Sequence, residues 1–423
     1  MTDRMILGNG VIYSTDSAET GLNNNVIVCG TSGCGKTMSI LEPRLLETFE
    51  SSLIVTVTKR KLVDKYTPVF KDRGYEVLDL NFVSPHLSSA AYDPLLFIKN
   101  IDDIHSFVES IVCEKISKGS VYDPYWYEAA MSLLSAEIAY VMATSKGARP
   151  SMADVISLHR TLKIEEGITE SIRTPLDDNF NALEGKADGY SVFALSCWRT
   201  FSSLPLKTAS CVFSELNTRI DKLFTPQITS MFRKPKKIDF KRISRNKTVL
   251  FVTTSPVNPS LHQLVNIFYS QAFKELFEYA ERRDDKMLPR QVNFLADDFA
   301  MGGRVKDFPE YISIFREKRI AVTLLIQSES QLESMYGSGS AVTIINNCDT
   351  YVYMGGTDIS TANSISQRLD IPVSDVLSMP LGQLAIFRRG DKPIITERYS
   401  VTQNEEFRRI TLEYESRVRN RAG

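Results

Sequence analysis

The chain has 423 residues, of which 43% are hydrophobic and 24% are charged, and its formal net charge is −1. These values are typical of a soluble globular protein of two or three domains, and they exclude a chain whose overall charge attracts polyanions. The sequence shows no secretory signal, no run of roughly 18 to 20 apolar residues and no closely spaced Cys or His ligands, so we expect a cytoplasmic protein without a zinc site.

Short apolar runs, rich in β-branched residues, recur towards both ends of the chain. They occupy residues 25–28, 53–57, 248–252, 292–296 and 321–326. Such near-continuous apolar runs, separated by helical patterns, are typical of strands that are buried on both faces of a sheet. We therefore expect an α/β fold with a mostly parallel central sheet.

A glycine-rich loop directly follows the first of these runs. Gly30, Gly35, Lys36 and Thr37 fit the pattern Gly-x4-Gly-Lys-Thr. The glycines let several backbone N–H groups point at one anion, and the helix that begins near Gly35 adds its positive end. We expect Lys36 to reach the β- and γ-phosphates of ATP, Thr37 to hold Mg²⁺, and Pro43 to kink the helix. The residues predicted to bind the nucleotide are Gly30, Thr31, Ser32, Gly33, Cys34, Gly35, Lys36 and Thr37.

The middle of the chain has a different pattern, with apolar residues at three- and four-residue steps. This pattern occupies residues 126–141, 153–162 and 207–224. We predict an all-α insertion at 97–223 between two parts of a nucleotide-binding domain, 1–96 and 224–400. The remaining residues, 401–423, form a C-terminal tail that we expect to be helical.

Polar side chains end two of the later apolar runs. Asp297 and Asp298 follow residues 292–296, and Gln327 follows residues 321–326. In a nucleotide site, Asp297 would complete the Mg²⁺ shell and Asp298 would polarise the attacking water. Gln327 would sense the γ-phosphate, since an amide can bond both an oxygen and a water. The alternatives are two acids that open an exposed loop and an amide that caps the next helix.

In order and spacing, these segments resemble the type IV coupling proteins of bacterial conjugation and type IV secretion (TraG/TraD-like), which are FtsK/HerA-type ATPases. The resemblance runs from Ile6 to about Arg398. Besides the glycine-rich loop, it is carried by residues 74–79 (GYEVLD), 92–95 (YDPL), 123–126 (DPYW), 297–300 (DDFA), 327–332 (QSESQL), 336–337 (YG) and 355–362 (GGTDISTA).

The resemblance implies a RecA-like P-loop NTPase domain with an inserted all-α domain, assembled as a homo-hexamer. The chain departs from the family pattern in three ways. Family members commonly begin with membrane helices, which are absent here; residues 58–61 replace an Asp-Pro-Lys-Gly-Glu motif; and Asp298 replaces a Glu. The first departure predicts association with a membrane only through a partner, at its inner face. The third concerns the rate of turnover more than ATP binding.

Arginine and lysine side chains suggest further contacts. A ring ATPase often completes its site with an arginine from the neighbouring subunit, and Arg316 is the candidate, with Arg388 and Arg389 as competitors. Residues 233–247 hold eight basic side chains against one acid, and residues 59–61 are all basic. Each segment could follow a DNA backbone or could be a solvated loop.

Together these features predict an ATP-hydrolysing coupling protein. It would deliver relaxase-bound single-stranded DNA, or protein substrates, to a type IV secretion channel, with the relaxosome and a channel ATPase or membrane component as partners. Two alternatives remain open. One is a soluble FtsK/HerA-like DNA pump without a secretion role, and the other is a docking adaptor that binds nucleotide without hydrolysing it.

Overall fold

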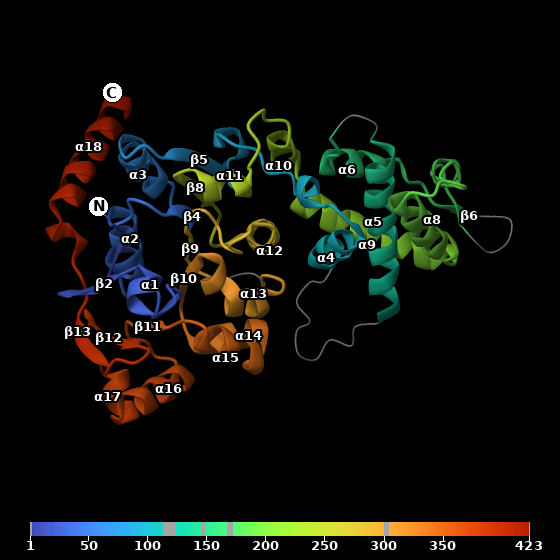
Figure 1. The fold of residues 1–423 in the computed structure, drawn as a ribbon. Helices are drawn as coiled ribbons and strands as arrows, with labels where there is room; N and C mark the ends of the chain where they lie inside the picture. Colours follow the sequence, from blue (N-terminus) through green and yellow to red (C-terminus); the bar gives the residue numbers. More distant parts are fainter. Residues whose placement is uncertain (1, 113–123, 146–148, 167–171, 300–303, 423) are drawn as a thin grey trace. The chain divides into compact units, whose positions relative to one another are not determined.

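The computed structural model describes residues 2–112, 124–145, 149–166, 172–299 and 304–422 (Figure 1). The chain divides into two compact units. Unit 1 contains residues 1–83, 239–258 and 272–423, and unit 2 contains residues 84–238 and 259–271. Within the described ranges, no helix combines the length and the apolar character that crossing a membrane requires.

Unit 1 is built on a nine-stranded sheet. In spatial order its strands are β13 (Ile394–Glu397), β12 (Gln383–Arg388), β11 (Thr350–Tyr353), β3 (Val26–Cys29), β10 (Ile320–Ile326), β9 (Val292–Ala296), β4 (Ser52–Val57), β8 (Thr248–Thr253) and β5 (Glu76–Asn81). The strands from β11 to β5 are parallel, whereas β12 and β13 add an antiparallel edge. The predicted mostly parallel α/β sheet is therefore confirmed.

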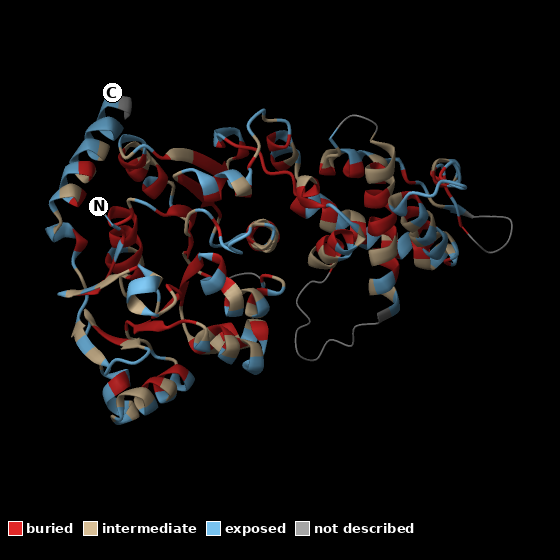
Figure 2. Ribbon diagram, in the orientation of Figure 1, coloured by how far each residue is buried: buried red, intermediate tan, exposed pale blue. Residues whose placement is uncertain are grey.

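The apolar runs predicted as strands form the interior of this sheet. Every residue of β3, β4, β8, β9 and β10 is buried, and Figure 2 shows these strands as the buried centre of unit 1. The other elements of unit 1 are β1 (Arg4–Gly8), β2 (Val11–Ser14), α1 (Ser17–Thr20), α2 (Glu42–Leu46), α3 (Arg60–Asp72), α11 (Phe240–Arg245), α13 (Phe308–Ile314), α14 (Glu329–Tyr336), α15 (Ser338–Asn346), α16 (Ile359–Leu369), α17 (Val373–Leu377) and α18 (Glu405–Ala422). Helix α12 (Pro259–Glu281) has residues in both units.

The helix that follows the glycine-rich loop begins with a π-helical segment, Thr37–Leu41, before it continues as α2. The Glu42 N–H bonds to the Thr37 carbonyl, five residues back. Pro43 has no N–H to donate and would clash with the carbonyl four residues earlier in a regular α-helix. The wider turn ahead of the proline relieves this clash, so the predicted disturbance takes the form of a π turn.

The C-terminal helix α18 packs against α3. Phe407 lies under the Lys65 ammonium, which is 3.4 Å from the ring centroid, and Arg73 Nη2 donates to both carboxylate oxygens of Glu406. Val401 and Ile410 belong to the same buried apolar cluster as the helix after the glycine-rich loop. The C-terminal segment is therefore part of the core of unit 1.

The described residues of unit 2 are helical apart from one pair of two-residue strands, β6 (Glu165–Glu166) and β7 (Ile172–Arg173). Its helices are α4 (Ile101–Val112), α5 (Pro124–Thr144), α6 (Met152–Thr161), α7 (Asp177–Asn181), α8 (Gly189–Ser202), α9 (Leu206–Leu223) and α10 (Pro226–Met231). Helix α5 packs against α4, α6, α8 and α9 and is the centre of this unit. The stretch expected to be helical throughout thus also contains a short antiparallel pair.

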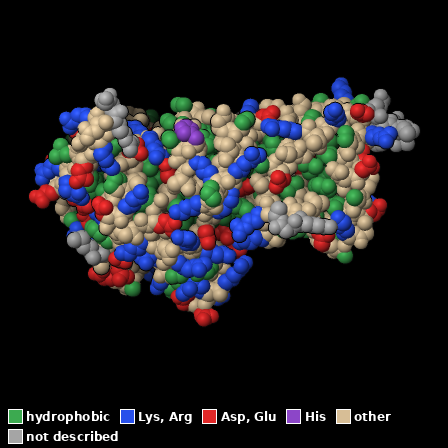
Figure 3. Space-filling model, turned by 90° about the horizontal axis from the view of Figure 1, so that it is seen from above, with side chains coloured by type: hydrophobic (Ala, Val, Ile, Leu, Met, Phe, Trp, Pro, Cys, Tyr) green, Lys and Arg blue, Asp and Glu red, His purple; other side chains and the backbone are tan. Residues whose placement is uncertain are grey.

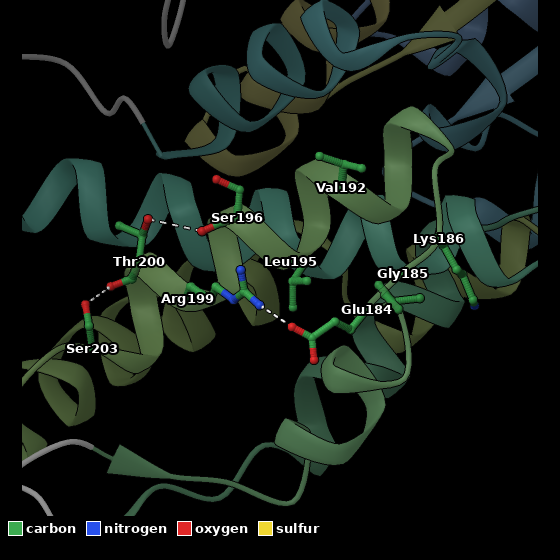
Figure 4. Close-up of a pocket in the computed structure, with 10 residues that line it drawn as sticks. Glu184, Gly185, Lys186, Val192, Leu195, Ser196, Arg199, Thr200 and Ser203 are labelled. Atoms are coloured by element: carbon green, nitrogen blue, oxygen red, sulfur yellow. Dashed lines mark hydrogen bonds and ion pairs between the residues drawn. The ribbon is translucent and has the colours of Figure 1, made fainter.

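A surface groove of about 690 Å³ lies beside α8 (Figure 4). Arg199 on α8 forms an ion pair with Glu184 across it, with 2.8 Å between the nitrogen and the carboxylate oxygen. Both side chains are largely exposed. The groove contains none of the residues predicted from sequence to form the functional site.

Candidate nucleotide-binding site

The parallel sheet brings the predicted site residues to one edge. Strands β3, β10, β9 and β4 are consecutive neighbours and run in the same direction, so their carboxyl ends lie side by side. The Gly30 N–H donates to the Ile326 carbonyl at 3.2 Å, and the Phe299 N–H donates to the Leu325 carbonyl at 2.9 Å. The segments that follow β3 and β9 are thereby each hydrogen-bonded to the end of β10 at this edge.

The glycine-rich loop has a backbone shape that only some residues adopt. Gly33 has φ +82° and Gly35 has φ +96°, in the left-handed region that glycine enters without strain. At Gly30, a Cβ would lie 2.7 Å from Cys34 Sγ and 3.0 Å from Met354 Cβ, so no larger residue fits. Cys34 thus fills space inside the loop, as expected for a small side chain at this position.

Lys36 is buried, with its ammonium folded back on the loop. Its Nζ donates to the Gly30 carbonyl at 2.5 Å and to the Thr31 carbonyl at 3.2 Å. Across the described parts of the chain, no carboxylate lies within ion-pair distance of this ammonium. A buried cation without an anionic partner is costly, so the loop is suited to receive an anion.

The two predicted acids follow β9, which is separated from the loop-bearing β3 by one strand, β10. Burial and the neighbouring Asp298 charge raise the pKa of Asp297 to about 6, although Lys36 and Lys59 act in the opposite direction. Asp298 has φ +53°, a left-handed conformation that Asp adopts more readily than most residues. A half-buried carboxylate whose pKa is raised in this way gains from a nearby cation.

Gln327 lies at the tip of β10, between the loop and the acids. Its backbone N–H donates to Gln331 Oε1 at 3.2 Å. The cap of α14 is Ser328, whose side chain accepts from the Gln331 N–H at 3.1 Å. The alternative in which the Gln327 side chain caps this helix is therefore wrong.

The three candidate arginines lie away from the loop of their own chain. Arg316 is exposed and precedes β10, at the amino edge of the sheet, opposite the edge that carries the loop. Arg388 pairs with Asp391 and stacks on the Tyr13 ring, and Arg389 pairs with Asp349. Only Arg316 among them is exposed without an ion pair in the described part of the chain.

The basic segments are largely engaged within the molecule. Arg60 pairs with Asp64 and Asp79, and the Lys61 ammonium lies 5.8 Å from the centroid of the Tyr414 ring. Arg242 pairs with Glu76, and Lys247 pairs with Glu50. On the face shown in Figure 3, acidic and basic side chains are interspersed. Lys59 and Lys61 are both exposed, and within the described residues Lys59 forms no ion pair or cation–π contact.

One residue near the loop was not predicted from sequence. Arg398, just after β13, donates from Nη1 to the Cys34 carbonyl at 3.2 Å. The same nitrogen lies 2.7 Å from the position that a Cβ on Gly35 would take. No local pattern signals this contact, because 364 positions separate the two residues in sequence and only the folded sheet brings them together.

A family model described as "Type IV secretory system Conjugative DNA transfer" matches residues 3–370. Among solved structures, the unbound monoclinic form of the bacterial conjugative coupling protein TrwBdeltaN70 is similar at TM-score 0.66 and 16% identity, covering 94% of this chain and 89% of that chain. TrwB in complex with the ATP analogue ADPNP is similar at TM-score 0.64 and 16% identity, with coverages of 89% and 85%. VirB4 of Thermoanaerobacter pseudethanolicus is similar at TM-score 0.51 and 11% identity, with coverages of 94% and 96%. A search of curated proteins found no match. At these identities the solved structures show the fold, which is that of a P-loop NTPase.

Proposed function

Because the chain belongs to the type IV secretory system conjugative DNA-transfer family, as its motifs predicted, we propose that it is an ATP-hydrolysing coupling protein. In this role it delivers relaxase-bound single-stranded DNA, or protein substrates, to a secretion channel. One observation carries the proposal: the tips of β3, β10 and β9 bring an anion-receptive loop, an amide and a carboxylate pair to one edge of a parallel sheet. Ligands of open α/β sheets bind at this edge.

Each side chain at the edge has a distinct part in the proposed reaction. The backbone N–H groups of Gly30 to Thr37 bind the phosphates, and Lys36 leaves the loop carbonyls to contact the β- and γ-phosphates. Asp298 orients the attacking water and accepts its proton, while Gln327 contacts the γ-phosphate. Arg316 of a neighbouring subunit would stabilise the charge that develops on the transferred phosphoryl group.

Thr37 and Asp297 are the residues that would hold Mg²⁺. When bound there, Mg²⁺ neutralises part of the charge on the β- and γ-phosphate oxygens. Two similar structures support both ligands, since TrwB was solved with ADPNP and with ADP and Mg²⁺. For this chain, nucleotide and metal binding are proposals.

A trans role for Arg316 requires a ring in which its amino-edge position faces the loop of the next subunit, so we propose a homo-hexamer. The partners in this proposal are a relaxosome with its DNA, and an ATPase or membrane component of the channel, which would recruit a cytoplasmic protein to the membrane.

The proposal is tested by ATP hydrolysis with and without single-stranded DNA. We expect DNA-stimulated hydrolysis in the wild type and its loss in Lys36→Ala, with no loss in Lys71→Ala, which removes an exposed lysine on α3 outside the site. ATP binding without turnover, unchanged by Asp298→Ala, would instead support a docking adaptor.

A second experiment separates a coupling protein from a general DNA pump. We expect the tagged chain to co-purify with a relaxase or a channel ATPase from donor cells. Hydrolysis that DNA stimulates equally well, together with no such partner, would favour a pump without a secretion role.

A further inference from the structure

The Arg398 guanidinium binds the phosphate loop from its outer side. Nη1 donates to the Cys34 carbonyl, which belongs to the same peptide group as the Gly35 N–H. In a trans peptide the C=O and the N–H point in opposite directions. A donor that holds the Cys34 carbonyl outward therefore holds the Gly35 N–H inward, towards the space where the loop receives an anion.

This peptide group needs an external restraint. Rotating it changes ψ of Cys34 and φ of Gly35, and glycine accepts either sign of φ at little cost. Gly33, also at positive φ, is a second residue of the loop with little torsional restriction. With the peptide rotated, a carbonyl oxygen in place of an N–H would face the phosphates and repel them.

Arg398 has the properties of such a restraint. Its side chain is exposed, and within the described part of the chain no carboxylate pairs with it. By contrast, Arg368 pairs with Glu329, and Arg389 pairs with Asp349. The Arg398 backbone is fixed, because its N–H donates to the Gly382 carbonyl at 2.7 Å. An arginine held by its backbone, with its charge uncompensated, is thus directed at the loop.

We propose that Arg398 is a positioning residue for phosphate binding, which fixes the Cys34–Gly35 peptide with its N–H directed into the loop. The inference rests on the proposed binding of ATP and deepens it. The Gly35 N–H contacts a phosphate that ATP and ADP share, so Arg398 governs affinity for both nucleotides and not the hydrolysis step. It also couples the loop to the segment between β13 and α18.

The test measures the affinity of the full chain for ADP–Mg²⁺ and for a non-hydrolysable ATP analogue, along with KM and kcat for ATP. For Arg398→Ala we expect both affinities to fall by about tenfold, as for the loss of one charge-assisted hydrogen bond. KM should rise by a similar factor, while kcat at saturating ATP stays within about twofold. Arg398→Lys, which keeps one donor, should recover most of the affinity. Arg408→Ala removes another exposed arginine of the C-terminal segment and should change neither affinity.

The outcomes separate the inference from the function on which it rests. If the wild type ignores both nucleotides, the proposed function itself is wrong. If the wild type binds and Arg398→Ala binds ADP equally well, or loses kcat without losing affinity, only the positioning role is wrong. If Arg398→Ala unfolds, Arg398→Lys is measured in its place. A folded Arg398→Lys protein whose affinity for ADP equals that of the wild type, or is slightly lower, supports the role. A folded Arg398→Lys protein that binds no ADP overturns it.

Discussion

The buried ion pair beneath the phosphate-loop helix predicts a measurable loss of stability in Glu42→Gln. The Lys65 ammonium lies 2.8 Å from Glu42 Oε2, and the two side chains are 3% and 7% exposed. Tyr66 donates its hydroxyl to the same oxygen at 2.7 Å. Glutamine keeps the shape of Glu42 and an acceptor for Tyr66, but it leaves the lysine charge buried without a carboxylate.

The magnitude follows from what remains around the ammonium. Removing one partner of a buried pair costs about 3–5 kcal/mol. Two interactions reduce this cost: the glutamine carbonyl can still accept from Lys65, and the Phe407 ring stays 3.4 Å from the ammonium. This desolvated cation–π contact, on the order of 2 kcal/mol, still stabilises the ammonium once the carboxylate is gone, so the charge is not left wholly uncompensated. We therefore expect the free energy of unfolding of unit 1 to fall by about 2–3 kcal/mol.

The assay must report on unit 1 alone. Both tryptophans, Trp126 and Trp198, belong to unit 2, so their fluorescence serves as an internal control during urea unfolding. Hydrogen exchange of peptides from β4 and β8 reports on unit 1. The double variant Glu42→Gln/Lys65→Met removes the stranded charge and should return to within about 1 kcal/mol of the wild type.

The pH dependence gives a further check on the same reasoning. Burial lowers the pKa of Lys65, and Glu42 opposes this effect. Without Glu42, the pKa of Lys65 in the folded protein falls further below its value in the unfolded chain. The free-energy cost of burying the lysine charge is then lost as pH rises above the folded pKa, because the folded protein releases the proton. The deficit of Glu42→Gln should thus shrink between pH 7 and pH 10. A deficit under about 1 kcal/mol that does not change with pH, or a double variant no more stable than the single one, would refute the reasoning.

Three further predictions concern other buried or restrained groups. Asp3→Ala should lower the free energy of unfolding by about 2–4 kcal/mol, because the Asp3 carboxylate accepts three backbone N–H groups at residues 49–51. Burial raises the pKa of Asp3, but these hydrogen bonds lower it on balance. The stabilising effect of the carboxylate is therefore present above the unfolded pKa of about 3.9 and is lost as pH falls below it. Acid unfolding of the wild type and the variant should show that their difference in stability disappears at low pH. Glu137→Gln should lower the urea midpoint reported by tryptophan fluorescence, since Glu137 and His159 form a fully buried pair in unit 2; an unchanged midpoint would contradict this expectation. Gly35→Ala should weaken ADP binding at least about tenfold in a titration, because an alanine is strained at φ +96° and its Cβ meets Arg398, whereas the unfolding of unit 2 should not change.

The interior of the sheet could be predicted from sequence because its strands are buried on both faces. The five apolar runs correspond to β3, β4, β8, β9 and β10. The edge strand β5 was not recognised, since Glu76 and Asp79 interrupt its apolar residues. Strand β11 is as long as β3, but its sequence TYVY has only one aliphatic side chain. Edge strands bury fewer residues, so their sequences carry a weaker pattern.

The candidate site residues at the carboxyl ends of the strands could also be predicted, because each comes directly after a recognisable strand in the sequence. Contacts between distant segments could not. Lys61 meets Tyr414 and Arg398 meets Cys34 only after α18 and β13 have folded onto the sheet. The sequence of a basic run such as residues 59–61 does not show whether its charges are free or paired.

The strand order also constrains the order in which the chain can fold. Strands β4 and β5 are consecutive in sequence through α3, yet β8 lies between them in the sheet, and residues 82–247 separate β5 from β8. During synthesis, β4 and β5 therefore emerge with unpaired edges and must keep a strand-wide space open until β8 is made. Pairings of such long sequence separation form slowly and leave strand edges exposed to aggregation. Most of unit 2 lies in the residues between β5 and β8, so this helical unit can fold during synthesis before β8 is available to complete the sheet.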